Sequence, residues 1–292
     1  MTHIAGATWG ISGPTFLLIY VALGVVILAG AIIWRRRYTS GPTGPLRSLT
    51  PTEVALLTGG RELAVYSSLA ALRAAEAVQI EGGHLRQIGP VPSGAPELDR
   101  AIHAAAGRRS LRSRDVAAEP GVAAILERTE AELTESGLLL SPAVRAHVRR
   151  GALAGVALLV FGIVRAIAGT QNGKPIGNLV LLLVLAGAGT LALAYVPRLS
   201  RAARASVATL RRDASHLRPS QSPSWATYGP ASAALGVGLF GTAAIWAADP
   251  AFAADAEIRR QTLASSGGYS GGDGGGSSSC GGGGCGGGGC GG

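Results

Sequence analysis

Three cysteines close the chain at five-residue intervals, Cys280, Cys285 and Cys290, within a stretch that is otherwise glycine and serine. Structural zinc sites place about two to four residues between paired cysteines and need a fourth ligand. Here four glycines separate each pair and the sequence holds no fourth cysteine, so we expect no zinc site. In an oxidising compartment, their odd number leaves at least one thiol for an intermolecular disulfide or a covalent attachment, so the expected chemistry depends on where the tail lies.

Outside the tail, the sequence contains none of the common catalytic or nucleotide-binding motifs. The five histidines are scattered, without partners at metal-ligand spacing: His3, His84, His103, His147 and His216. The long apolar segments carry no acidic residue that would indicate an ion or proton path. We therefore expect no enzyme, no cofactor, no metal site and no proton-coupled carrier, and the position of the tail becomes the main question.

The apolar residues are gathered into four long segments. The composition is 47% hydrophobic and only 15% charged, which is atypical of a soluble domain. Residues 15–34 hold no charge, and a helix of this length matches the hydrocarbon thickness of a bilayer. Residues 151–169, 176–196 and 231–248 are the other predicted spans, with Arg165 near the end of the second.

The basic residues predict the orientation of these spans, because cytoplasmic loops are enriched in lysine and arginine. Residues 1–14 contain none, residues 35–150 contain sixteen and residues 197–230 contain six. Both basic loops are cytoplasmic if the N-terminus lies outside, and a four-span chain then places its C-terminus outside as well. The first span is not expected to be a cleaved signal peptide, since its positive charges follow the apolar stretch.

Residues 35–150 are expected to form a small helical cytoplasmic domain. Thr50, Pro51 and Glu53 predict the start of a helix, and Gly59-Gly60 its end. Further helices are expected over 61–77, 97–106 and 119–136. Residues 78–88 alternate apolar and polar around Gly82-Gly83, which predicts a β-hairpin. Helices followed by a small hairpin are typical of a winged helix, but basic and acidic residues nearly balance here, so the charge pattern for nucleic acid is missing.

Residues 197–230 carry a basic amphipathic segment, which is typical of a helix lying on an anionic inner leaflet. The alternative is that its arginines only fix the topology. The arginines expected at the inner leaflet, for topology or lipid contact, are Arg35, Arg36, Arg37, Arg149, Arg150, Arg198, Arg201, Arg204, Arg211 and Arg212.

Ala251 and Ala253 follow the last apolar segment with the small-residue spacing that a signal peptidase reads. Cleavage after Ala253 would release a Cys/Gly peptide. Because alanine is common throughout this chain, a chance match is the alternative.

The order of these parts resembles a known family. A cytoplasmic segment opening LTPTEVALLTGG, a last apolar segment reading YGPASAALGVGLFGTAAIWAADPAFA and the tail SSSCGGGGCGGGGCGG are similar to the actinobacterial membrane proteins of the TIGR04222 family. The resemblance covers nearly the whole chain. It implies this membrane architecture and carries over no activity, cofactor or catalytic residue.

The sequence thus predicts a mainly α, four-span protein of the bacterial inner membrane with both termini outside. An outside loop is expected at 170–175, a linker at 249–266 and a disordered tail at 267–292. The expected function is a non-enzymatic scaffold whose exported tail makes thiol contacts with itself or a partner. The alternatives are a regulatory or sensory protein whose cytoplasmic domain binds a protein or DNA, a precursor of a Cys/Gly peptide, and a tail whose cysteines do little.

Overall fold

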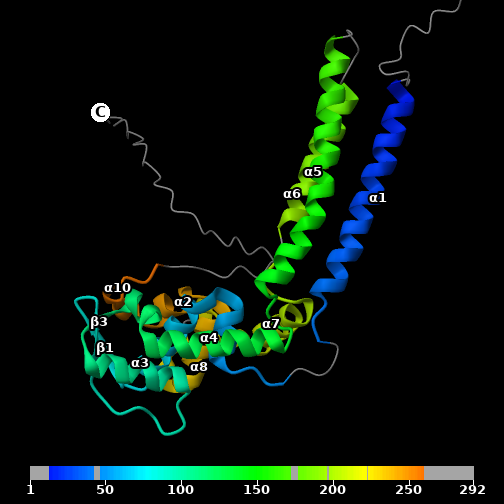
Figure 1. The fold of residues 1–292 in the computed structure, drawn as a ribbon. Coiled ribbons are helices and arrows are strands. Elements are labelled where there is room, and N and C mark those ends of the chain that lie inside the picture. The colour runs from blue at the N-terminus through cyan, green and yellow to red at the C-terminus, as the bar shows by residue number, and fades with distance from the viewer. Residues whose placement is uncertain (1–12, 43–46, 172–176, 196, 222, 260–292) are drawn as a thin grey trace, which may run out of the picture.

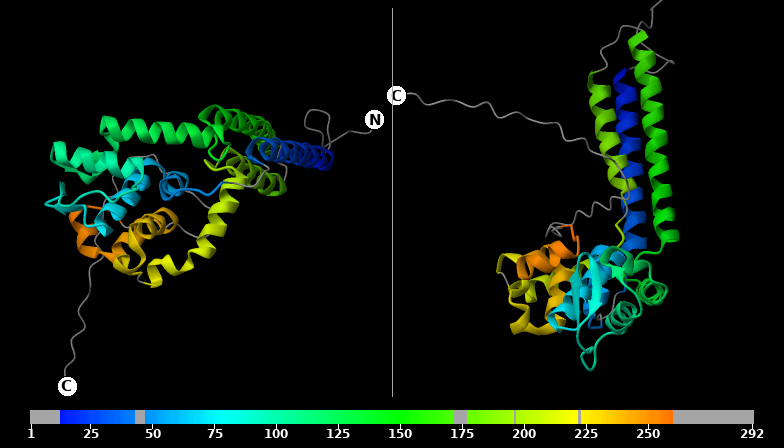
Figure 2. Two further views of the ribbon diagram at one scale, coloured as in Figure 1. Left: turned by 90° about the horizontal axis from the view of Figure 1, so that it is seen from below. Right: turned by 90° about the vertical axis from the view of Figure 1, so that its left-hand side faces the viewer.

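The computed structural model describes residues 13–42, 47–171, 177–195, 197–221 and 223–259. These residues form a bundle of long helices and a compact domain at its base (Figure 1). The chain is mainly helical, as predicted, and its described part includes a small antiparallel sheet. Two separate stretches of sequence, residues 47–141 and 197–259, build the compact domain (Figure 2).

The elements follow one another in this order: α1 (Gly13–Thr39), α2 (Pro51–Ala74), β1 (Val78–Glu81), β2 (His84–Gln87), α3 (Glu97–Arg108), β3 (Leu111–Arg112), η1 (Ser113–Ala118), α4 (Pro120–Glu135), α5 (Pro142–Gln171), α6 (Gly177–Ala194), α7 (Arg201–Asp213), η2 (Ser215–Leu217), η3 (Pro219–Gln221), α8 (Trp225–Phe240), α9 (Ala243–Ala248) and α10 (Pro250–Asp255).

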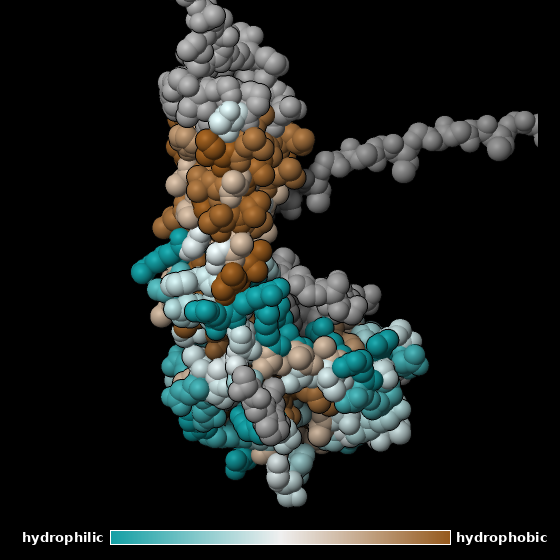
Figure 3. Space-filling view, turned by 90° about the vertical axis from the view of Figure 1, so that its right-hand side faces the viewer, coloured by the Kyte–Doolittle hydropathy of each residue, from teal (hydrophilic) through white to brown (hydrophobic). Residues whose placement is uncertain are grey.

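Helices α1, α5 and α6 form the bundle. Two of them hold segments long and apolar enough to cross a membrane, Leu17–Thr39 and Pro142–Ala168, while α6 holds the shorter apolar segment Val180–Ala194. Large apolar side chains face outward from the bundle, and those of Val25 and Leu185 are each 60% exposed. Figure 3 shows this apolar column above a polar domain.

Small residues bring the three bundle helices close together. A Cβ atom at Gly155 would lie 2.6 Å from Oγ1 of Thr190, and one at Gly162 would lie 2.6 Å from the hydroxyl oxygen of Tyr20. The Tyr20 hydroxyl donates to the carbonyl of Leu158 at 3.2 Å, which links α1 to α5. Close approach over small residues is typical of helices that pack in lipid.

The compact domain is built around α2, and the predicted start of this helix is confirmed. The backbone N–H of Glu53 donates to Oγ1 of Thr50 at 3.3 Å, and the N–H of Thr50 donates to the Glu53 carboxylate at 2.8 Å. This reciprocal pair satisfies two amides that the first turn leaves without helical partners. The expected stop at Gly60 is a bend instead, with φ +80° and ψ −164°, after which the helix continues.

The predicted hairpin is confirmed. Val78 pairs with Gln87 and Glu81 with His84, and the turn residues Gly82 and Gly83 have φ values of +57° and +79°. Glycine adopts such positive φ angles without a Cβ clash. The structure adds a short third strand, β3, beside β2.

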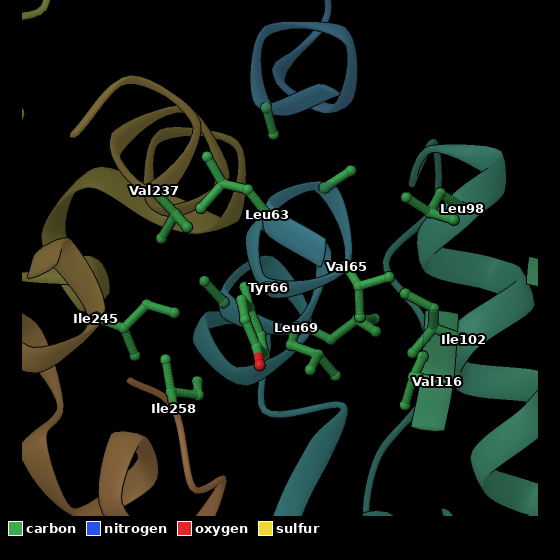
Figure 4. Close-up of a cluster of buried hydrophobic side chains, with 14 of the residues drawn as sticks. Leu63, Val65, Tyr66, Leu69, Leu98, Ile102, Val116, Val237, Ile245 and Ile258 are labelled. Atoms are coloured by element: carbon green, nitrogen blue, oxygen red, sulfur yellow. The ribbon is translucent and has the colours of Figure 1, made fainter. Parts of the chain in front are cut away.

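The expected fourth span, residues 231–248, is not one continuous helix in this structure. It is divided at Gly241, where φ is +81°, into the end of α8 and the short α9. Val237 and Ile245 are fully buried in the same core as Leu69 of α2 (Figure 4). Hydropathy alone does not distinguish these two environments, because a helix buried in protein is as apolar as a helix buried in lipid.

Helix α8 packs along α2 at short range. The Ser67 hydroxyl donates to the carbonyl of Ala234 at 2.8 Å, and the Thr58 hydroxyl donates to the carbonyl of Gly238. A Cβ atom at Gly238 would lie 3.2 Å from the backbone nitrogen of Ala55. Small residues on α8 therefore fit against α2 rather than facing outward.

The chain after α8 stays on the domain up to residue 259. Nε1 of Trp246 donates to the carbonyl of Ile258 at 3.0 Å, and the Ser113 hydroxyl donates to the carbonyl of Ala256 at 2.6 Å. Phe252 and Ile258 are buried in the core. The last described residues before the tail, up to 259, therefore belong to the compact domain.

The domain and the bundle join where the chain leaves for α5 and returns from α6. Leu139 and Leu199 form an antiparallel bridge. The N–H of Leu140 donates to the carbonyl of Arg198 at 2.8 Å, and the N–H of Ser200 donates to the carbonyl of Leu138 at 3.0 Å. The expected basic amphipathic helix, α7, begins directly after this junction.

Candidate functional site

Polar and basic side chains meet at the base of the bundle, in a cavity of about 280 Å³ lined by Arg35 and Thr39 of α1 and by Arg201 and Arg204 of α7. Spacings of four residues on α1 and three on α7 place each pair on one helix face. We call this group of four residues the basic junction.

The basic junction carries positive charge that no acidic side chain of the described residues neutralises. No carboxylate lines the cavity, and among the described residues none of its three arginines forms an ion pair with an acidic side chain. Nε of Arg204 is shielded from solvent and has no hydrogen-bond partner in the described part of the chain. Burial lowers the pKa of Arg204, and the neighbouring charges of Arg201 and Arg35 lower it further. A group of this kind favours an anion as its partner.

Backbone contacts hold the basic junction in place. The Ser200 hydroxyl accepts from the N–H of Ala203 at 3.2 Å and caps α7. The N–H of Ala202 donates to the carbonyl of Ser40 at 3.2 Å, which ties α7 to the end of α1. Nη1 of Arg35 donates to the carbonyl of Ala192 at 3.1 Å, so α6 also contributes to its position.

The other predicted arginines have separate positions. Arg36, Arg37, Arg149, Arg150 and Arg212 are exposed. Nε of Arg211 donates to the carbonyl of Leu239 at 2.9 Å and so contacts the end of α8. Arg198 lies beside Gly60 and lines a different cavity, of about 410 Å³, together with Glu127, Glu130 and Arg145. The structure therefore brings together Arg35, Arg201 and Arg204 out of the ten.

Thr39 belongs to the basic junction although sequence reasoning did not select it. Its side chain is buried, and its hydroxyl donates to the carbonyl of Arg35 at 2.8 Å. Its place one turn after Arg35, at the end of the apolar run, is the signal that could have identified it.

An aromatic group lies close to the basic junction and was also missed. The ring of His147 on α5 stacks on that of Trp34 with centroids 5.3 Å apart, and Tyr38 lies 5.0 Å from Trp34. Tryptophan and tyrosine at the end of an apolar helix are typical of the membrane interface. Their position directly after the first apolar run was visible in the sequence.

The candidate cleavage residues lie on α10. Ala251 is exposed, but Ala253 is fully buried and Phe252 between them is 3% exposed. The bond after Ala253 is therefore inside a packed helix, where a protease would first have to unfold the C-terminal part of the domain. The thiols of Cys280, Cys285 and Cys290 lie outside the described residues.

No group of three or more metal-ligating side chains occurs in the described ranges. His103 is buried, with Nε2 at 2.8 Å from the carbonyl of Gly89 and Nδ1 at 2.6 Å from the Gln87 amide. These contacts give this histidine a structural setting between α3 and the hairpin.

Comparison with known proteins adds no assignment: no family model, curated protein or solved structure matches this chain.

Proposed function

We propose that this protein is a membrane-anchored, non-enzymatic interaction protein in which α1, α5 and α6 cross the bilayer. The exposed apolar surface of all three helices supports this, because lipid is the environment that would cover it. The compact domain then lies at one membrane face.

The main support for this topology is that α8, α9 and α10 pack against α2 in one core. Residues packed in one core must occupy one side of the membrane, so residues 47–141 and 197–259 share a compartment. The first of these stretches belongs to the arginine-rich loop, which favours the cytoplasm. Three spans then place the N-terminus outside and the tail inside, in contrast to the exported tail expected from four spans.

A cytoplasmic tail changes the expected chemistry of Cys280, Cys285 and Cys290. The cytosol keeps thiols reduced, so these residues would be free thiols on a glycine-rich chain rather than disulfides. We therefore propose that the tail and the compact domain act together as a cytoplasmic scaffold for protein partners.

The charges of the compact domain favour protein over nucleic acid as its partner. Arg61 pairs with Glu130 at 2.8 Å, and Arg73 pairs with Asp249 at 3.1 Å. Arg128 and Arg109 also have acidic partners. Arginines neutralised within the domain supply little attraction for phosphate backbones.

The chain itself provides the test, because its only cysteines are the three in the tail. A membrane-impermeant maleimide should label them in permeabilised cells but not in intact cells. As a control, a variant with the three cysteines changed to serine and Ser12→Cys should be labelled in intact cells. Labelling of the native tail in intact cells would contradict the three-span proposal and support the exported tail.

A further inference from the structure

An apolar groove of about 200 Å³ lies between the bundle helices, further from the compact domain than the basic junction. It is lined by residues of α1, α5 and α6: Val21, Gly24, Leu28, Leu158, Gly189 and Leu193. Glycines at two of these positions leave space along the surface of the bundle. A linear apolar group would fit such a groove.

The groove and the basic junction follow one another along the same pair of helices. Seven residues are close to two helical turns, so one face of α1 carries Val21, Leu28 and Arg35. Each of these residues lies about 10 Å along the helix from the next. On α6, Leu193 lines the groove, and the carbonyl of the preceding Ala192 accepts the hydrogen bond from Arg35. An apolar surface thus leads directly to a group of unneutralised guanidiniums.

We propose that one anionic phospholipid binds along α1 and α6, with an acyl chain in the groove and its phosphate between Arg35, Arg201 and Arg204. The inference rests on the proposed membrane insertion and assigns one defined lipid site within it. A zwitterionic headgroup would bring its own cation close to the three arginines, so the site favours a headgroup of net negative charge. The adjoining apolar groove favours a lipid over free phosphate.

The experiment uses full-length protein in micelles that contain phosphatidylglycerol and phosphatidylcholine, analysed by native mass spectrometry. Wild type should retain one phosphatidylglycerol. Arg35→Gln with Arg204→Gln should reduce this adduct about tenfold or more, the loss expected when charge-assisted hydrogen bonds to phosphate are removed. The matched control is Arg36→Gln with Arg212→Gln, which also removes one arginine from α1 and one from α7, both exposed. The control should retain the adduct.

Equal loss in both double variants would overturn the proposal, because it would show a diffuse attraction of lipid to net charge. A second arm adds inorganic phosphate to protein in phosphatidylcholine alone. If phosphate raises the melting temperature as much as phosphatidylglycerol does, the site binds the free anion and the lipid assignment is wrong.

A third variant, Gly189→Leu, keeps every arginine and fills the groove beside Leu28. It should lose the adduct while its helical content is unchanged, and retention of the adduct would overturn the assignment of the acyl chain. If the arginine variants do not fold, this variant still tests whether a lipid binds in the groove. Extraction with alkaline carbonate tests membrane insertion separately. Release of the protein from membranes by this treatment would contradict the proposed insertion itself, independently of the lipid site.

Discussion

At the scale of single residues, Asp99 is the carboxylate with the most unusual environment among those described. It is 5% exposed in the interface between α3 and α2. Burial raises the pKa of Asp99 from 3.8 to about 6, and the neighbouring Ser68 hydroxyl opposes only part of this change. The folded protein therefore binds a proton at Asp99 more tightly than the unfolded chain does.

The sign of the resulting pH dependence follows. The stabilising contribution of neutral Asp99 is complete below about pH 4 and is lost as the pH rises through about 6. We predict that Asp99→Asn, which keeps a neutral side chain of the same shape, raises the free energy of unfolding at pH 8 by about 1–3 kcal/mol. The measurement is unfolding of the solubilised protein between pH 4 and 8, followed by tryptophan fluorescence.

Asp115→Asn is the control for this prediction, because Asp115 is exposed. It should leave the pH profile unchanged. If the profile of Asp99→Asn follows that of wild type, Asp99 is ionised in the folded protein and burial does not raise its pKa.

At the scale of elements, the bend at Gly60 sets the direction of α2 on either side of it. Gly60 has φ +80° and ψ −164°, a backbone conformation that is nearly restricted to glycine. A Cβ atom there would also lie 3.2 Å from Nη1 of Arg198, next to the junction with the bundle. The bend thus positions the first turns of α2 relative to the rest of the helix.

We predict that Gly60→Ala destabilises the domain by about 2 kcal/mol, because alanine must be forced into this region of φ and ψ. Gly121→Ala is the control: Gly121 lies in α4 with open space at its Cβ position, and alanine should be neutral or slightly stabilising there. Thermal unfolding measures both variants. Equal effects of the two substitutions would count against a strained bend.

At the scale of the whole molecule, we expect the compact domain to fold without the bundle helices. The bridge between Leu139 and Leu199 brings the two ends of its interruption together. We predict that residues 47–141, joined to 197–259 by a linker of about four residues, fold as a soluble domain. Circular dichroism and a cooperative unfolding transition without detergent would show this.

The same chain ended at residue 240 is the matched control. It lacks Ile245, Phe252 and Ile258, which are buried in the shared core, and it should not fold. If the longer chain requires detergent, or if both chains behave alike, then α9 and α10 do not belong to the core as described.

The expectations that the structure confirmed depend on contacts between neighbouring residues. The capping pair of Thr50 and Glu53 and the hairpin at Gly82-Gly83 both arise within a few residues of sequence. Local steric and hydrogen-bonding preferences determine such features, so residue types at fixed spacing are sufficient to predict them.

By itself, the sequence determined where the apolar helices lie, how the first of them is flanked by charge and where the domain has its caps and turns. Only the tertiary structure decided the environment of residues 231–248, because hydropathy measures removal from water and does not distinguish lipid from protein. The convergence of Arg35, Arg201 and Arg204 was likewise decided by folding, since more than 160 residues separate α1 from α7 along the chain. Their proximity results from the packing of the bundle onto the domain.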